Sequence, residues 1–198
     1  LGRRAKGLSL PGEKALIGHG ISFCALCDGG FYRHGAVAVI GGGETAFHDA
    51  WYLAGLGADV TLIHRRKAFT AEPDRVRRVG ECAALVTPYR AAAYLTDRFP
   101  DGIREDTETP GRLTGVRIVH TETGETKTIR ADGIFLAVGQ TPNTRFAGLR
   151  PILDTNGYVI TDAAGKTAVP HICAAGDVRA AAFCQILAAC ASGAVSVQ

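Results

Sequence analysis

The sequence lacks the features that would place a protein in a membrane or outside the cell. No apolar run approaches the roughly 18 residues that would span a bilayer, and the N-terminus lacks the basic, apolar and small-residue regions of a signal peptide. We therefore expect a soluble, cytoplasmic protein without membrane contact. Methionine is also missing and the sequence begins abruptly at Leu1, which indicates part of a longer protein.

A strong excess of one charge is also missing. The 198 residues carry 22 basic and 19 acidic side chains, a net charge of +3 that is too mild to indicate nucleic-acid binding. The densest basic run, Arg75-Val76-Arg77-Arg78, is typical of a solvated helix face. With 46% hydrophobic residues, the chain can bury the core of one or two domains.

Cysteine is present, but in neither the number nor the spacing of a secreted disulfide scaffold. Cys24 and Cys27 form the only close pair, and no second Cys-x-x-Cys or His-x-x-x-His completes a zinc site, so no metal is expected. A redox dithiol fits better, because the adjacent Asp28 can deliver a proton to a leaving thiolate. A cap or turn remains an alternative role for Asp28. The other cysteines are expected to be small buried side chains: Cys82, Cys173, Cys184 and Cys190.

The pattern after the cysteine pair predicts an α/β fold with a Rossmann-like parallel sheet. Residues 36–40 form a short apolar run bounded by glycine, typical of a central strand buried on both faces. A helix over residues 44–56 and a strand over 60–63 complete a right-handed crossover with a parallel pair. The other elements expected around this sheet are a helix over residues 71–84 and strands over 84–87 and 133–138.

Outside this sheet the pattern changes. Alternation with glycine turns predicts an antiparallel three-stranded layer, from residues 91–95, 113–121 and 125–130, that covers one face of the parallel sheet. Residues 1–21 indicate an irregular lead-in or linker. Short strands and turns, including one strand over 158–162, and a helix over 180–197 are expected after residue 149.

A glycine turn follows the central strand and fits the dinucleotide pattern Gly41-x-Gly43-x-x-Ala46. Gly41 permits a tight turn, Gly43 lets the backbone approach a pyrophosphate, and Ala46 lets helix and strand pack closely. Glu44 and Thr45 open the helix, where backbone amides meet the phosphate charge. A purely structural bend is the alternative, but the position between a buried strand and a helix favours a dinucleotide site.

The end of the second strand indicates which dinucleotide is bound. An NAD site would place an acid about 20 residues downstream of the glycine turn, whereas an NADP site uses Arg for the additional phosphate. Here the sequence has His64-Arg65-Arg66. A solvated charge cluster is the alternative, but a bidentate guanidinium at this place matches phosphate oxygens.

Together these motifs resemble the low-molecular-weight thioredoxin reductase family over essentially the whole sequence. Phe23-Cys24-Ala25-Leu26-Cys27-Asp28-Gly29 is similar to the family's redox motif, residues 41–46 to its NADPH loop and residues 64–66 to its phosphate clamp. Residues 141–144, 157–158 and 174–178 are similar to its return into the FAD domain. The family's opening FAD half, with its own glycine motif, has no counterpart here.

The resemblance implies the flow of electrons and the residues that carry it. Hydride would pass from NADPH to FAD, and electrons to a Cys24–Cys27 disulfide, with Cys27 facing the flavin, Cys24 attacking the partner's disulfide and Asp28 as the acid. Asp177 would bind the FAD ribityl region and Gln185 would lie near the isoalloxazine. Gly139 and Gly176 complete the implied cofactor-binding residues.

The resemblance also implies an organisation and has departures. Residues 1–21 would end the FAD domain or act as a linker, residues 22–145 would bind NADPH and carry the dithiol, and residues 146–198 would be the C-terminal part of the FAD domain. Thr70 stands where the family often has another phosphate-binding Arg, with Lys67 as a substitute cation. Cys184 replaces an Arg before Gln185, and Leu26 replaces a Thr.

We therefore expect an NADPH-dependent thioredoxin reductase, an FAD flavoprotein and homodimer whose partner is thioredoxin or a thioredoxin-like protein. One alternative is a related flavoprotein disulfide reductase with a different donor or partner, such as ferredoxin or a peroxiredoxin. A truncated, non-catalytic nucleotide-binding module is the other.

Overall fold

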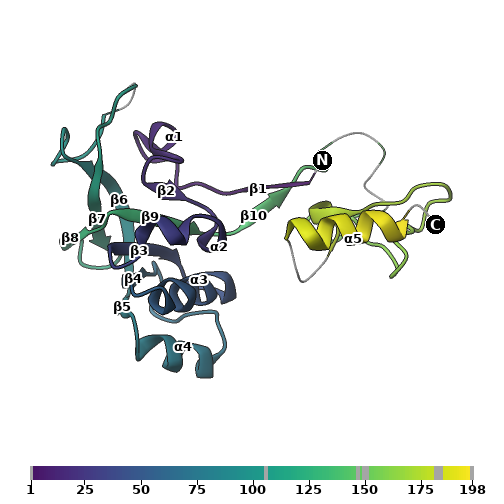
Figure 1. Cartoon of the computed structure of the whole chain (residues 1–198), viewed down its shortest axis with the longest axis horizontal. Coiled ribbons are helices and arrows are strands. Elements are labelled where there is room, and N and C mark those ends of the chain that lie inside the picture. The colour runs from purple at the N-terminus through teal and green to yellow at the C-terminus, as the bar shows by residue number, and fades with distance from the viewer. Residues whose placement is uncertain (1, 105–106, 146–147, 149–151, 181–184, 197–198) are drawn as a thin grey trace. The chain divides into compact units, whose positions relative to one another are not determined.

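The computed structural model describes residues 2–104, 107–145, 148, 152–180 and 185–196. The chain divides into two compact units, a larger one of residues 7–138 and a smaller one of residues 1–6 and 139–198. Figure 1 shows the helices and strands of both units. The assignment of domains to NADPH and FAD stays a prediction.

The larger unit is built on a parallel sheet with strand order β2-β9-β3-β4-β5. The central strand is β3 (Ala36–Gly41), as predicted from its apolar run. Helix α3 (Glu44–Gly55) connects β3 to its parallel neighbour β4 (Asp59–Ile63), which confirms the predicted crossover. The remaining strands are β2 (Ile21–Ser22), β5 (Ala84–Val86) and β9 (Gly133–Ala137).

The two faces of the parallel sheet are covered by different layers. Val37 and Val39 pack in the core formed with α3, whereas Ala38 and Ile40 pack in the core formed with the antiparallel strands. Alternating side chains of one strand thus enter two cores, which explains why the run is apolar throughout. The second layer, in the order β6-β7-β8, consists of β6 (Tyr89–Thr96), β7 (Leu113–His120) and β8 (Thr126–Arg130). The predicted α/β fold with its antiparallel layer is confirmed.

Helix α4 (Pro73–Gly80) is shorter than the helix predicted over residues 71–84. Glu72 is extended because it precedes Pro73, and proline at the first helical position begins the helix there. The helix ends at Gly80, so Cys82 lies in the following turn and is exposed. Cys173 and Cys190 are exposed as well, so the prediction that these three are buried was wrong; Cys184 lies outside the described residues.

The lead-in is more ordered than its sequence indicates. Before β2 it contains α1 (Glu13–Leu16), whose Glu13 is only 9% exposed. The carboxylate of Glu13 accepts hydrogen bonds from the Tyr94 hydroxyl at 2.6 Å and from the Leu8 amide at 2.9 Å. Burial and the Glu13 carboxylate raise the pKa of Tyr94 above its usual range. Glu13 therefore anchors the lead-in on the antiparallel layer.

The smaller unit pairs β1 (Arg3–Ala5) with β10 (Gln140–Pro142) in an antiparallel ribbon. Its small core comprises Ile152, Val159 and Val178. The strand predicted over 158–162 is instead a pair of isolated bridges at Val159. Helix α5 (Ile186–Ser196) is preceded by the short 3-10 helix η3 (Gly176–Val178); residues 181–184 and 197 of the predicted helix lie outside the described residues. Among the described helices, none has the length and apolar character needed to cross a membrane.

Helix α3 carries a carboxyl group, Asp49, that is only 7% exposed. Burial raises the pKa of Asp49 from 3.8 to about 6, although the His48 imidazole lies 3.7 Å away and opposes the shift. A carboxyl group whose pKa is higher in the folded than in the unfolded protein contributes stability below the unfolded pKa. This contribution is lost as the pH rises through the folded pKa. Stability from this group should therefore fall between pH of about 4 and about 6.

We expect Asp49→Asn to remove this decline and to be more stable than the wild type at pH 7, by on the order of 2 kcal/mol. Urea unfolding at pH 4 and pH 7 measures the difference. Asp59→Asn is the matched control, because Asp59 is exposed. The expectation fails if Asp49→Asn and Asp59→Asn show the same pH dependence.

Candidate active site

Cys24 and Cys27 form a disulfide with an Sγ–Sγ distance of 2.10 Å. Cys24 caps the short helix α2 (Ala25–Asp28), and its Sγ accepts a hydrogen bond from the Cys27 amide at 3.1 Å. Cys27 is exposed and Cys24 is half-buried. An amide aimed at Cys24 Sγ favours a thiolate on that sulfur once the disulfide is reduced.

Asp28 ends α2 and is held by a serine that the sequence analysis did not single out. The Ser22 hydroxyl donates to Asp28 Oδ2 at 2.6 Å and accepts from the Cys24 amide at 3.1 Å. Ser22 ends β2 and is 6% exposed. The sequence feature that could have identified Ser22 is its polar side chain in an otherwise apolar segment, two positions before Cys24.

The segment around the disulfide packs against α3 on one side and exposes two apolar side chains to solvent. After α2, the 3-10 helix η1 (Gly29–Tyr32) lies against α3, where a Cβ on Gly29 would come within 2.9 Å of Leu53. Burial, with a smaller contribution from the Asp28 carboxylate, raises the pKa of Tyr32. Two apolar side chains of this segment face solvent, Leu26 at 43% and Phe31 at 85% exposure.

The predicted glycine turn joins β3 to α3, and its first two glycines leave no room for a side chain. A Cβ on Gly41 would lie 2.5 Å from the Ala137 carbonyl oxygen and 2.7 Å from Ala46 Cβ. A Cβ on Gly42, which the sequence analysis did not single out, would lie 2.1 Å from His64 Nδ1. Around Gly43 the nearest atom is Thr70 Oγ1 at 3.5 Å, so its surroundings are more open. Glycine is therefore required at 41 and 42 by packing alone.

His64 supports this turn from the end of β4. Its ring is 8% exposed, stacks on Phe69 and lies 3.2 Å through Nε2 from the Ala68 carbonyl oxygen. Burial is the main cause that lowers the pKa of His64, with the neighbouring Arg66 and Arg65 charges adding to it. His64 is therefore a neutral packing residue of the loop at pH 7, and its cofactor contact stays a prediction.

Arg65 and Arg66 are exposed, and within the described part of the chain neither side chain forms an ion pair. By contrast, Lys67 lies 2.8 Å from Glu122. The backbone of the loop is fixed, since Thr87 Oγ1 donates to the Arg66 carbonyl oxygen. Two free guanidinium groups thus stand on a fixed loop beside the glycine turn.

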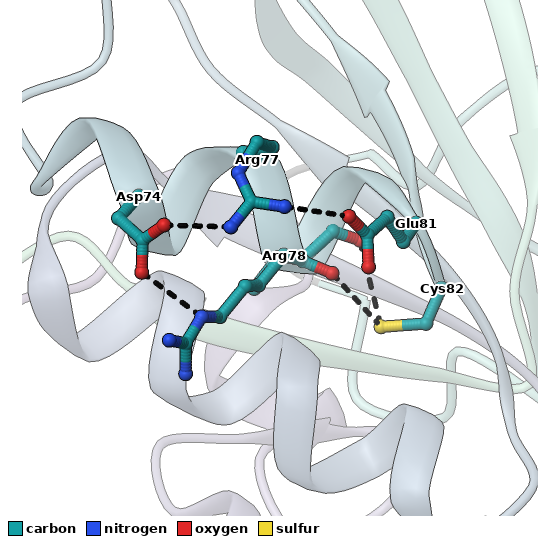
Figure 2. Close-up of polar contacts among 6 residues, drawn as sticks. Asp74, Arg77, Arg78, Glu81 and Cys82 are labelled. Atoms are coloured by element: carbon teal, nitrogen blue, oxygen red, sulfur yellow. Dashed lines mark hydrogen bonds and ion pairs between the residues drawn. The ribbon is translucent and has the colours of Figure 1, made fainter.

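The arginines of α4 differ, because their charges are compensated. Figure 2 shows Arg77 between Asp74 and Glu81, and Arg78 paired with Asp74. The nitrogen–oxygen distances are 2.7 Å from Arg77 to Asp74, 3.0 Å from Arg77 to Glu81 and 2.9 Å from Arg78 to Asp74. This network confirms that the basic run is a solvated helix face. Among the described residues, Arg77 and Arg78 are therefore paired with carboxylates, unlike Arg65 and Arg66.

Glu44, Thr45 and Thr70 lie around the start of α3. Glu44 and Thr45 are exposed, and the Glu44 carboxylate accepts from the Glu72 amide at 2.7 Å and pairs with Arg75 at 2.8 Å. Thr70, at the place of a further arginine in the resemblance, donates its amide and hydroxyl to the Gly42 carbonyl oxygen at 2.8 Å and 3.1 Å. Thr70 therefore fixes the glycine turn and adds no positive charge.

The remaining candidates belong to the smaller unit. Gly176 has φ of 72° and donates its amide to Ser192 Oγ at 2.8 Å. The Asp177 carboxylate lies 3.3 Å from Arg3 Nε yet stays 33% exposed. Gly139, with φ of 103°, accepts from the Lys6 amide at 3.0 Å, and the Gln185 carbonyl accepts from Ala189 at 2.9 Å.

Comparison with known proteins identifies the family of this arrangement. The sequence profile described as Pyridine nucleotide-disulphide oxidoreductase matches residues 1–193. The chain belongs to this family. The family's description joins the two features found in the larger unit, a glycine turn suited to a nucleotide and a disulfide.

Relatives of this chain include proteins with different names. A thioredoxin reductase of Treponema pallidum is 36% identical over 197 residues, which cover 98% of this chain and 60% of the relative. A glucosaminate ammonia-lyase of Pseudomonas fluorescens is also 36% identical, over 97% of this chain and 59% of the relative. The chain therefore spans about 60% of the length of these relatives.

Among solved structures, the thioredoxin reductase of Streptococcus pyogenes superposes with a TM-score of 0.79 at 30% sequence identity. The match covers 98% of this chain and 60% of that structure. The oxidoreductase fold is thus shared over nearly all of this chain.

The geometry of the larger unit suits a dinucleotide. Gly41 and Gly42 are enclosed by protein atoms, whereas Gly43 is open and caps the start of α3, so a phosphate could approach the backbone at Gly43 and the first amides of the helix. Arg65 and Arg66 supply positive charge just after the neighbouring strand, the place at which dinucleotide-binding folds of this type select between NAD and NADP.

Proposed function

We propose that this chain is the nucleotide and disulfide part of an NADPH-dependent flavoprotein that reduces the disulfide of thioredoxin or a thioredoxin-like protein. The observation that carries the proposal is an accessible Cys24–Cys27 disulfide, with Asp28 directly behind it, in the same compact unit as the glycine turn. The resemblance also implies a homodimer, and this assembly and the cytoplasmic location expected from the sequence stay predictions.

The dithiol would transfer its electrons by thiol–disulfide exchange. Reduction of the Cys24–Cys27 bond takes two electrons and yields two thiols. The Cys24 thiolate attacks a sulfur of the partner's disulfide, which forms a mixed disulfide and releases one partner thiolate. Cys27 then attacks Cys24 Sγ, which releases the second partner thiolate and restores the Cys24–Cys27 bond. Asp28, which directly follows Cys27 in the sequence, would supply the proton that a leaving thiolate takes.

The cofactors of the proposal are NADPH and FAD. NADPH would contact the turn from Gly41 to Ala46, and Arg65 and Arg66 would bind its 2′-phosphate. When bound, FAD supplies the chemistry that passes two electrons from the nicotinamide to the disulfide. Residues of the smaller unit would hold part of it, and the partly exposed Asp177 carboxylate suits a cofactor hydroxyl. The other proposed contacts in that unit are Gly139, Gly176 and Gln185.

A protein partner is favoured by the surface beside the disulfide. Leu26, adjacent to Cys27 in the sequence, and Phe31, four residues after it, expose apolar side chains, and apolar area near a reactive group is typical of a surface that another protein covers. Peroxiredoxin and ferredoxin remain the alternative partner and donor. The name of the Pseudomonas relative shows that likeness alone does not select the reaction; the dithiol with its acid favours disulfide reduction over a lyase or a non-catalytic module.

The test uses the full-length protein, loaded with FAD, under anaerobic conditions. NADPH should bleach the flavin absorbance, and oxidised thioredoxin should restore it with continuous turnover. Parallel assays replace thioredoxin by a peroxiredoxin and NADPH by NADH or reduced ferredoxin. A flavin that NADPH leaves oxidised would reject the proposal, and faster turnover with another pair would reassign the partner or donor.

A further inference from the structure

The hydroxyl of Ser22 connects the proposed acid to the proposed attacking cysteine. Ser22 Oγ lies 2.6 Å from Asp28 Oδ2 and 3.1 Å from the Cys24 amide nitrogen. Ser22 is 6% exposed, so these bonds form largely away from water. One side chain therefore contacts both ends of the redox motif.

The direction of these bonds is fixed by chemistry. The Cys24 amide can only donate, so Ser22 Oγ is the acceptor in that contact. The hydroxyl has one proton, and the Asp28 oxygen at 2.6 Å is a much better acceptor than the Cys24 carbonyl oxygen at 3.4 Å. The proton of Ser22 therefore points to Asp28 Oδ2, which leaves Oδ1 for proton transfer.

We propose that Ser22 is a positioning residue for disulfide exchange, acting through Asp28; this inference rests on the proposed function. In the exchange step the bond from Cys24 Sγ to the partner sulfur forms and the partner's disulfide bond breaks. The Asp28 carboxyl gives its proton to the leaving sulfur, and no electrons enter from outside the thiol pair. Ser22 donates to the carboxylate that remains, and it keeps this group beside Cys24.

The role is distinct from maintaining the fold. Strand β2 is held by backbone pairing of Ile21 and Ser22 with Ile134 and Phe135 of β9, and this pairing needs no hydroxyl. The Cys24 amide is the one structural partner that loses an acceptor when the hydroxyl is removed. A change that acts only through the fold would slow exchange whether or not Asp28 can donate a proton.

The experiment measures exchange without NADPH. Full-length protein is reduced with dithiothreitol, freed of the reductant and mixed with hydroxyethyl disulfide, and the single-turnover rate of Cys24–Cys27 oxidation is recorded. We expect Ser22→Ala to be about tenfold slower than the wild type, the loss of one hydrogen bond to a charged group. Ser22→Thr, which keeps the hydroxyl, should stay within about threefold of the wild type.

A double-mutant cycle with Asp28→Asn decides the case. If Ser22 acts through Asp28, adding Ser22→Ala to Asp28→Asn should cause little further loss. An equal loss in both backgrounds, an unchanged rate in Ser22→Ala, or a loss in Ser22→Thr as large as that in Ser22→Ala would overturn the inference. Since dithiothreitol is the reductant in this assay, its outcome does not depend on NADPH. Failure of NADPH to reduce the protein would therefore reject the proposed function without changing the outcome for Ser22.

Discussion

Replacing Cys27 with serine is expected to abolish NADPH-dependent reduction of thioredoxin, with a loss of roughly a thousandfold or more. The reason is stoichiometric, because a single thiol can form a mixed disulfide but cannot resolve it. Cys24 keeps its position as the cap of α2 and the amide of residue 27 beside its Sγ. The variant should therefore accumulate a mixed disulfide between Cys24 and the partner.

Turnover assays and non-reducing electrophoresis with peptide mapping measure both effects. Cys82→Ser is the matched control, because Cys82 is a free, exposed cysteine of the same unit. The control should keep wild-type turnover and form no covalent complex that involves residue 82. Wild-type turnover in Cys27→Ser would mean that electrons reach the partner without this disulfide.

Replacing both Arg65 and Arg66 with alanine is expected to weaken NADPH binding by about 100-fold and to leave NADH binding nearly unchanged. A phosphate carries roughly −1.5 to −2 charges near neutral pH, and each charge-assisted hydrogen bond at this exposed site should contribute about a factor of ten. Thr70 adds no charge and Lys67 is paired with Glu122, so no neighbouring cation of the loop compensates fully.

Calorimetry with each nucleotide measures this loss. The matched control replaces Arg77 and Arg78. This double substitution removes the same charge, but from helix α4, where Asp74 and Glu81 already compensate it (Figure 2). The control should bind NADPH with little change. An equal loss of NADPH and NADH affinity in the Arg65 and Arg66 variant would place the effect on the loop instead of the phosphate.

Local patterns were sufficient to predict much of the larger unit. The burial of β3 on both faces and the tight glycine turn after it could both be predicted, because each depends on a few neighbouring residues. The arginines after β4 could be found in the same way, since the length of the crossover fixes the end of the neighbouring strand.

Contacts between distant residues were out of reach of these patterns. The order of the lead-in depends on Glu13 meeting Tyr94, 81 positions later. The burial of His64 depends on Gly42 and Phe69, which its sequence position beside two arginines did not reveal, and this burial lowers its pKa. Cys82 is exposed because Pro73 and Gly80 confine α4, which alanine-rich surroundings did not reveal.

The central claim is that reducing equivalents from NADPH arrive at one particular pair of sulfurs. The most direct measurement adds one equivalent of NADPH to the full-length protein without oxygen, alkylates the new thiols and locates them by peptide mass spectrometry. The account predicts two new thiols per chain, at Cys24 and Cys27, and an unchanged pattern at Cys82, Cys173 and Cys190. Oxidation of NADPH with Cys24 and Cys27 still joined as a disulfide would contradict it.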